Sequence, residues 1–419
     1  MPQFLSKKPK IFYGYWIMVA AFLFVFTHAG CVFYVFSLFV TPLQADFGWG
    51  RGEIMAAMTI YFLVSGLVSP FVGRVIDRYG VRNIVFIGAL VGGLGLILLS
   101  QMSELWHFYL GYIISGVATT AFGPVSATAM ISNWFEKRRG TALGIMSTGF
   151  GVGGFVMAPL VGGWFIPSFG WSVSYVVLAL MTWIIVIPLA LFVIRTKPAD
   201  MGLNVDGIEE PEIASETKLW RSTTEGLSLK MAMATSIFWL IAIAFIINGF
   251  TTIGTVQNQA PHLEDIGFPM AVVATALGII GLASAVGKVI FGWLCDRIPP
   301  KYACAIGFGL QAIAIIILIN VKTTTSLAII WPYAIILGLS IGSWLPTMSM
   351  LTSTSFGLAS YGAIYGMIYF SQSIGSATGP LMAGYLYDTM NTYHWAFVIF
   401  VALYAVAIPA VLLVRRPKS

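Results

Sequence analysis

Charged residues are scarce in this sequence. Only 9% of the 419 residues are Asp, Glu, Lys or Arg, whereas 58% are hydrophobic. A soluble domain carries about 25% charged residues, and a chain with far fewer has too little polar surface to cover a globule in water. The composition therefore excludes a soluble enzyme. It also excludes a nucleic-acid-binding protein, although the net charge is +6.

Residues and motifs for several kinds of chemistry are also lacking. The 3 cysteines, Cys31, Cys295 and Cys304, are too few for a disulfide framework and match no metal-binding spacing. We therefore expect no metal site and no cofactor. The sequence contains no G-x-x-x-x-G-K-[ST] phosphate loop, which argues against an ATP-driven process. No pair of acidic residues lies inside an apolar run, so an enzyme acting within the membrane is not expected.

Long apolar runs dominate what is present. One crossing of the hydrocarbon core takes about 20 apolar residues, and such runs must be helical because lipid cannot hydrogen-bond the backbone. The first run is far longer than the core of a cleavable signal peptide. We predict an all-α membrane protein with twelve transmembrane helices, at 13–43, 53–73, 83–101, 106–133, 141–166, 170–194, 234–260, 270–293, 302–321, 327–352, 359–387 and 392–414.

The basic residues fix the expected orientation. With the N-terminus in the cytoplasm, nineteen of the 22 Lys and Arg residues fall in the terminal segments and loops of the cytoplasmic side. Arg51 and Lys322 fall on the outer side, and Lys288 falls inside a helix. Cytoplasmic loops of membrane proteins are enriched in Lys and Arg. We therefore expect both termini in the cytoplasm of a protein of the cell membrane, either plasma or inner.

The chain divides into two similar halves. GRVIDRYGVR (73–82) after the second helix matches GWLCDRIPPK (292–301) after the eighth, and GGFVMAPLVGG (153–163) is echoed by GSATGPLMAG (375–384) at nearly the same offset. Repeated units of this kind are common in transporters. We predict two pseudo-symmetric six-helix bundles, 1–194 and 234–419, joined by a polar cytoplasmic linker at 195–233.

The first repeated motif resembles the signature of the major facilitator superfamily, G-x-x-x-D-R-x-G. The resemblance implies the fold of that superfamily and a transport function. Asp77 and Arg78 in the first copy, and Asp296 and Arg297 in the second, stand at cytoplasmic helix ends. There they could pair with neighbours and hold one conformation closed, which makes them gating candidates; the alternative is an ordinary cluster of cytoplasmic charge.

A finer resemblance points to one branch of the superfamily. WFEKRRGTALGIMSTG (134–149) resembles the segment that enters the fifth helix of monocarboxylate transporters, and FYGYW (12–16) resembles the start of bacterial relatives. The opening lacks the acidic residue of the animal members. The oxalate:formate antiporters are near relatives of the same branch.

Lys288 is the main candidate for substrate binding. A Lys inside a membrane span costs about 2.5–3.5 kcal/mol on insertion scales and needs a partner or a wet cavity. No carboxylate lies in the middle of a predicted span, so a bound anion is the natural partner. The alternative is that the Lys288 side chain extends along its helix to the cytoplasmic surface.

The resemblance supports the same residue. Aligning GKVIFGW (287–293) places Lys288 where monocarboxylate and oxalate:formate transporters carry a substrate-binding Arg in the eighth helix. Ser284 stands where the animal family has an Asp that is implicated in proton coupling, and Ile368 stands where the oxalate transporter has a second cation. A single embedded cation suits a monoanion better than a dianion.

His28 is the second candidate, because it is the only titratable group in the middle of a span in the first half. An unperturbed His titrates near neutral pH. It could bind substrate or carry a proton together with Lys288, or it could be a neutral packing residue.

Polar stripes run along four further helices and either join helices or line a cavity. Their members are Asn248, Thr252, Thr255 and Gln259; Tyr361, Tyr365, Tyr369, Gln372 and Ser376; Ser340, Ser343 and Thr347; and Tyr112, Ser115 and Thr119. As further substrate ligands we select Asn248, Tyr365, Tyr369, Ser284, Ser343 and Tyr112.

Together these patterns predict a secondary transporter of small monocarboxylates such as lactate or pyruvate, coupled to protons and working by alternating access. Its partners would be the anion, the proton and the lipid bilayer, with no nucleic acid, and we expect a monomer. An organic-anion exchanger of the oxalate:formate type is the alternative. Drug efflux is less favoured because a buried Lys would repel cationic drugs. A sensor would need a larger soluble domain.

Overall fold

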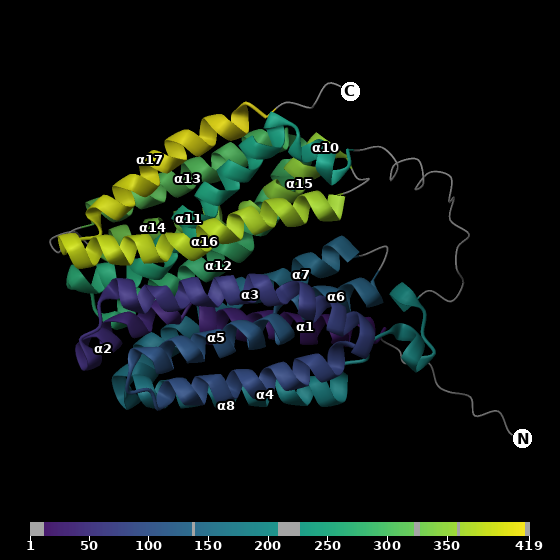
Figure 1. Cartoon of the computed structure of the whole chain (residues 1–419), viewed down its shortest axis with the longest axis horizontal. Coiled ribbons are helices and arrows are strands. Elements are labelled where there is room, and N and C mark those ends of the chain that lie inside the picture. Colours follow the sequence, from purple (N-terminus) through teal and green to yellow (C-terminus); the bar gives the residue numbers. More distant parts are fainter. Residues whose placement is uncertain (1–11, 136–138, 208–226, 322–326, 358–360, 415–419) are drawn as a thin grey trace, which may run out of the picture.

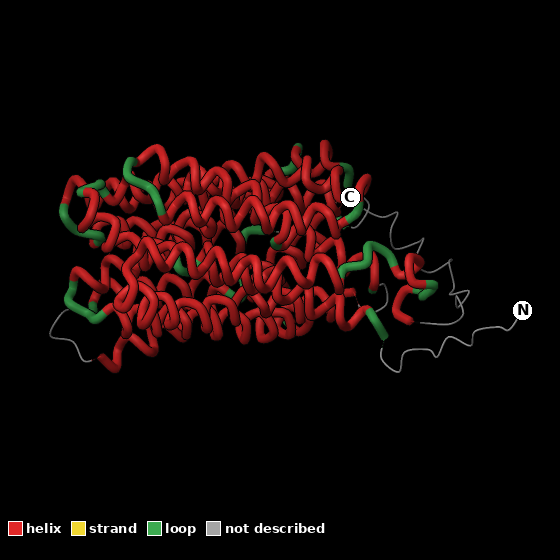
Figure 2. Tube along the Cα trace, turned by 90° about the horizontal axis from the view of Figure 1, so that it is seen from below, coloured by secondary structure: helices red, strands yellow, loops and turns green. Residues whose placement is uncertain are grey.

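A computed structural model describes residues 12–135, 139–207, 227–321, 327–357 and 361–414. Within these ranges the chain forms helices joined by short loops and no strand, as the tube in Figure 2 shows. The predicted all-α architecture is confirmed. The helices run roughly parallel to one long axis (Figure 1).

Helices from the first half of the chain lie together in the lower part of Figure 1. Three of its α-helices continue directly into π-helical turns; the label η marks both π-helical turns (η1 to η3) and 3-10 turns (η4 to η6). The elements are α1 (Gly14–His28), η1 (Ala29–Phe33), α2 (Phe36–Phe47), α3 (Arg51–Tyr79), α4 (Val81–Ser100), α5 (Leu105–Phe122), α6 (Pro124–Trp134), α7 (Arg139–Leu160), η2 (Val161–Phe165), α8 (Ile166–Pro188) and η3 (Leu189–Val193).

Helices from the second half lie in the upper part of the same view, in green and yellow. They are α10 (Leu229–Met233), α11 (Ser236–Asp265), α12 (Met270–Arg297), α13 (Pro300–Asn320), α14 (Ile330–Ile341), α15 (Trp344–Phe356), α16 (Tyr361–Met390) and α17 (His394–Leu412), with the 3-10 turn η6 (Leu327–Ile329) before α14. Between the halves, η4 (Pro198–Met201) and η5 (Val205–Gly207) belong to the predicted linker, of which 208–226 lies outside the described residues.

In the described part of the chain, 10 helical segments are long and apolar enough to cross a membrane. One of them, Ala142–Val193, is 52 residues long and contains a break at Gly170, whose φ is 77°. It therefore holds two of the predicted spans. α16 adds another, because its 30 residues pack along both α11 and α3. The twelve predicted helices are all present, with ends that differ by a few residues.

Apart from the π-helical turns η2 and η3 at the ends of α7 and α8, three predicted spans are interrupted. The first passes through the π-helical η1 directly after His28, the fourth breaks at Gly123 before Pro124, and the tenth breaks around Gly342. Continuous hydrophobicity along each run gives no sign of these breaks. In membrane proteins, an irregular backbone is tolerated where it is buried in protein or lines a cavity.

The two ends of the molecule differ. We call the end where α1 begins at Gly14 and α17 finishes at Leu412 the terminal end, and the end where α2 finishes at Phe47 and α3 begins at Arg51 the far end (Figure 1). The two halves meet mainly through α3 with α16, α7 with α12 and α2 with α11.

Glycines allow α7 and α12 to approach closely. The Gly151 Cα faces the carbonyl oxygen of Gly281, and Gly281 in turn faces the carbonyl oxygen of Gly151. Any side chain at either position would collide with backbone. Small residues of this kind let membrane helices cross with their backbones in contact. This crossing positions Lys288 of α12 beside α7.

Candidate functional site

A cavity of about 400 Å³ lies between the two halves, near the middle of the molecule. Residues from α1, η1, α7, α11, α12, α14, α15 and α16 line it, so both halves contribute to its wall. The three helix breaks all reach this space, through Phe33, Pro124 and Trp344. A volume of this size is within the range of small-molecule sites.

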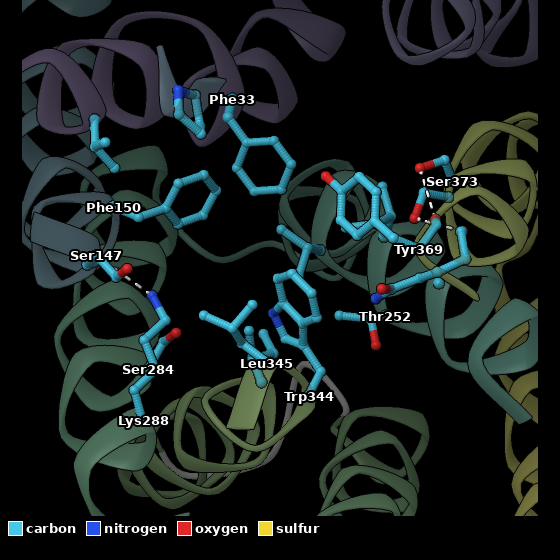
Figure 3. Close-up of a pocket in the computed structure, with 18 of the residues that line it drawn as sticks. Phe33, Ser147, Phe150, Thr252, Ser284, Lys288, Trp344, Leu345, Tyr369 and Ser373 are labelled. Atoms are coloured by element: carbon cyan, nitrogen blue, oxygen red, sulfur yellow. Dashed lines mark hydrogen bonds between the residues drawn. The ribbon is translucent and has the colours of Figure 1, made fainter. Parts of the chain in front are cut away.

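Lys288 lies on the cavity wall. Its Nζ donates a hydrogen bond to the backbone carbonyl of Ser147 on α7, at 3.2 Å (Figure 3). The ammonium also lies 5.4 Å from the centre of the Phe150 ring, within cation–π range. α12 continues to Arg297, nine residues beyond Lys288, or roughly 13 Å of helix. Lys288 therefore reaches across to the other half and does not extend along α12 to the surface.

The charge of Lys288 has no acidic partner at this site. No Asp or Glu is among the described residues that line the cavity, and Ser284 occupies the wall one turn before Lys288. One backbone carbonyl and one aromatic ring leave most of the donor capacity of an ammonium unused. The site is therefore electropositive and suited to an anion.

His28 also lines the cavity, at the junction of α1 and η1. Its Nδ1 lies 3.3 Å from the hydroxyl of Tyr61, which is itself 2.9 Å from the hydroxyl of Thr119. The His28 ring lies 5.9 Å from that of Phe150. Phe150 thus lies beside both predicted proton-coupling residues, His28 and Lys288.

Amide and hydroxyl groups form a different part of the wall, on α11 and α16. Asn248 donates through Nδ2 to Thr252 Oγ1 at 3.2 Å and to Gln311 Oε1 at 3.4 Å. Gln372 Nε2 donates to Asn248 Oδ1 at 3.5 Å. Tyr404 is fully buried on the side of the network away from the cavity, and its hydroxyl lies 3.3 Å from that of Thr252. These residues join four helices, and three of them, Asn248, Thr252 and Gln372, also line the cavity.

Aromatic side chains occupy the space between the lysine and the amide network. Figure 3 shows Phe33, Phe150, Trp344 and Tyr369 around the cavity, with Lys288 and Thr252 on opposite sides. The Trp344 and Tyr369 ring centres are 6.3 Å apart. Tyr369 is 48% exposed and borders the cavity.

Six of the eight residues that we expected to bind substrate meet at this cavity: Lys288, His28, Asn248, Tyr365, Tyr369 and Ser284. Tyr112 and Ser343 are not among its lining residues. Tyr112 packs between Phe36 and Phe108 in the first half, and Ser343 donates to the carbonyl of Ser340 at 2.7 Å. Helical spacing alone did not distinguish these structural positions from the wall of the cavity.

The predicted gating residues lie at the terminal end. Asp296 and Arg297 are exposed at the end of α12, and the Arg297 guanidinium lies 4.5 Å from the Trp293 ring. Asp77 and Arg78 belong to α3, but their side chains lie outside the described residues. Their pairing therefore stays a prediction.

An ion pair between a buried Arg and an Asp at the far end was not predicted from the sequence. Arg51 binds Asp265 through both terminal nitrogens, each at 2.6 Å, and its Nε donates to Gln44 at 2.9 Å. Its guanidinium also lies 3.8 Å from the centre of the Tyr387 ring. Arg51 belongs to the first half, and Asp265 and Tyr387 belong to the second. In the sequence Arg51 had stood out only as an isolated cation of an outer loop.

A second carboxylate binds the start of α3. The two oxygens of Asp388 on α16 accept hydrogen bonds from the backbone N–H groups of Arg51 and Gly52, at 2.8 and 2.6 Å. The first N–H groups of a helix lack partners within the helix and carry partial positive charge. We call Arg51, Asp265 and Asp388 the far-end latch, since they tie the halves together.

The fold, the interhelical cavity and the embedded Lys288 describe a membrane transport protein, not an enzyme. Comparison with known proteins gives the family: the sequence profile of the Major Facilitator Superfamily matches residues 17–379. The chain belongs to this superfamily. It is a multi-pass membrane transporter.

Similar sequences include several monocarboxylate transporters. Human monocarboxylate transporter 12 is 25% identical over 410 residues, covering 92% of this chain and 77% of that protein. Rat monocarboxylate transporter 13 is 23% identical, covering 94% and 87%. The MFS-type transporter YcxA of Bacillus subtilis is 23% identical, covering 90% and 89%.

Solved structures share the fold at lower identity. A bacterial homologue of the lysosomal transporter Spinster, described as inward-facing and occupied, superimposes with a TM-score of 0.76 at 14% identity, covering 98% of each chain. The nucleoside transporter NupG superimposes with a TM-score of 0.74 at 13% identity, covering 97% of this chain and all of that chain.

Proposed function

We propose that this protein is a secondary transporter of monocarboxylates, in which Lys288 binds the carboxylate. The observation that carries the proposal is the position of the Lys288 ammonium: it borders a cavity between the halves, about 13 Å of helix from the end of α12. No described acidic side chain lines that cavity. The names of the monocarboxylate transporters that resemble the chain support the same substrate class.

The contact of Lys288 joins the two halves, and this suggests how substrate binding leads to alternating access. Lys288 of the second half donates to the Ser147 carbonyl of the first half. An incoming carboxylate brings a full negative charge to the ammonium, which attracts it more strongly than a neutral carbonyl does. We propose that the side chain then turns toward the anion and that this changes the contact between α12 and α7. We propose that the two six-helix bundles, on either side of the linker, then move relative to each other.

The far-end latch defines the conformational state. Arg51, Asp265 and Asp388 tie the halves together at the end opposite to that where α1 begins. With both termini in the cytoplasm of a cell-membrane protein, the latch lies outside and the structure represents an inward-facing state. Transport to or from the outside requires the latch to open, while Asp77, Arg78, Asp296 and Arg297 hold the cytoplasmic side closed.

Proton coupling uses groups that already line the cavity. A monoanion and a proton that enter together leave the net charge of the site unchanged. His28, which lies 3.3 Å from the Tyr61 hydroxyl and beside Phe150, is one proton candidate, and Lys288 is the other.

Anion exchange is the second candidate function, favoured by one observation. Ser284 stands one turn before Lys288, and no described carboxylate accompanies that lysine. In an exchanger Lys288 never has to lose its charge, because one anion replaces another. Counterflow in liposomes without a pH gradient would distinguish exchange from proton symport.

The test of the carboxylate site is uptake of labelled lactate and pyruvate by proteoliposomes that contain Lys288→Ala, Lys288→Arg or the unchanged protein. We expect Lys288→Ala to reduce uptake at least about a hundredfold, since a hydrogen-bonded charge pair is lost. Lys288→Arg should keep part of the activity because it keeps the charge.

Lys301→Ala is the matched control. Lys301 donates to the carbonyls of Leu412 and Val414 at the terminal end, away from the cavity. It should transport normally. Near-normal uptake by Lys288→Ala would remove Lys288 from the binding site and overturn the proposed function.

A further inference from the structure

The cavity has two chemically different ends. Lys288 stands at one, and a patch of neutral polar groups from α11 and α16 stands at the other, with aromatic side chains between them (Figure 3). We call the second group the amide patch; it consists of Asn248, Thr252, Gln372, Ser373 and Ser376. We infer that the site prefers acids that carry an uncharged hydroxyl or amide group at the end remote from the carboxylate, and that Gln372 binds this group. This inference rests on the proposed function of Lys288.

The amide patch is held rigidly from behind. Gln311 and Tyr404, both buried and outside the cavity lining, bind Asn248 and Thr252, with Gln311 Nε2 2.6 Å from Thr252 Oγ1. These contacts use the Nδ2 group of Asn248, so its Oδ1 is left to accept from Gln372 Nε2. In the Gln372 amide, the Nε2 group is therefore the one that is hydrogen-bonded within the network.

The side-chain oxygen of Gln372, Oε1, has no hydrogen-bond donor among the described residues. Gln372 is only 9% exposed. Buried polar atoms without partners are uncommon, and each calls for a cause. The terminal torsion of a glutamine is soft, so a small rotation turns this oxygen toward a ligand in the cavity. The free group is an acceptor, and its partner must therefore be a donor.

Charge limits that donor to a neutral group. The amide patch contains no cation, so a second carboxylate would lie unpaired near acceptor oxygens. It contains no anion either, and an ammonium would find no counter-charge. A hydroxyl or an amide N–H meets both conditions. The cavity of about 400 Å³, with Trp344 and Tyr369 along its wall, then takes the apolar body between the two polar ends.

The experiment compares pairs of acids that differ only at the remote end. A short series of ω-hydroxy acids of increasing length, and the unsubstituted acids of the same lengths, compete with labelled substrate for binding to the purified protein. We expect one length at which the hydroxy acid binds about tenfold more tightly than its unsubstituted partner, the effect of one hydrogen bond.

Gln372→Leu should bring that ratio close to one. The ratio is measured within each variant, so a general loss of affinity cancels. Gln372→Glu tests for a new preference: a carboxylate at this position should make ω-amino acids the preferred competitors. Ser371→Ala is the matched control on α16, because Ser371 donates to the Met367 carbonyl and does not line the cavity; it should keep the hydroxyl preference.

The outcomes separate the two proposals. If Lys288→Ala removes binding of every acid but no length shows a hydroxyl preference, or if Gln372→Leu keeps that preference, the inference about Gln372 is wrong and the carboxylate site stands. If Lys288→Ala binds all acids normally, the proposed function fails first.

Discussion

At the scale of single residues, the cavity assigns different surroundings to its two ionisable groups. Lys288 contacts a backbone carbonyl and an aromatic ring, whereas His28 contacts the Tyr61 hydroxyl. An imidazole beside a hydroxyl can exchange a proton without losing its hydrogen bond, because one ring nitrogen donates and the other accepts in the neutral form. His28 is therefore better placed than Lys288 to pass a proton while Lys288 keeps the anion.

The prediction for His28 concerns the pH profile. In His28→Gln proteoliposomes we expect monocarboxylate uptake to lose most of its rise with an inward proton gradient, because glutamine keeps a hydrogen bond but cannot titrate. Uptake is measured over a series of external pH values at constant internal pH. His107→Gln is the control, because His107 lies at the start of α5, where its Nδ1 accepts a hydrogen bond from the backbone N–H of Glu104. A His28→Gln profile like that of the unchanged protein would leave His28 without a role in coupling.

At the scale of elements, the crossing of α7 and α12 transmits the state of Lys288 to the other half. Gly151 and Gly281 bring the two backbones into contact, and the Lys288 link to Ser147 lies one to two turns away from that point. Two helices that meet backbone to backbone can roll on each other with little side-chain repacking. The crossing is thus suited to serve as a pivot.

The prediction for this pivot uses two glycines of the same helix. A Cβ at Gly151 would collide with the Gly281 carbonyl oxygen, whereas a Cβ at Gly144 has nothing within 4 Å. Gly151→Ala should lower the stability by about 1–3 kcal/mol, the usual cost of overpacking, and should slow transport. Gly144→Ala should change neither. Thermal unfolding in detergent and initial uptake rates check both variants; equal behaviour of the two would show that the contact is not tight.

At the scale of the whole molecule, the far-end latch holds the halves in one of their arrangements. Arg51 has a side chain that is only 3% exposed, and that of Asp265 is 31% exposed. Removing Asp265 leaves the buried charge of Arg51 without its acidic partner. The open arrangement, in which water reaches both groups, then becomes relatively more favourable.

We therefore expect Asp265→Asn to shift the population toward an arrangement open at the far end by about tenfold, a change of roughly 1.4 kcal/mol. Distances between spin labels on the far ends of α3 and α11 report this population. Arg82→Leu is the control, because Arg82 binds the Leu191 carbonyl within the first half. An unchanged distance distribution in Asp265→Asn would mean that the latch does not set the equilibrium.

The sequence by itself determined the helices, their number and most of the predicted residues that line the cavity. Hydrophobic runs of the length of a bilayer have no other solution than helix, so the twelve spans followed from composition. A charge within such a run is costly, which singled out Lys288 and His28 before any fold was known. The polar stripe on α11 likewise gave Asn248, which lines the cavity.

Only the tertiary structure decided which polar residues share one space. Tyr112 and Ser343 have the same spacing as true lining residues, yet their helices turn them toward protein neighbours. Arg51, Asp265 and Asp388 are far apart in the sequence and meet only when the halves close. Periodicity along one helix fixes which residues share a face, but the partner of that face depends on the packing of other helices. That packing is a property of the whole fold.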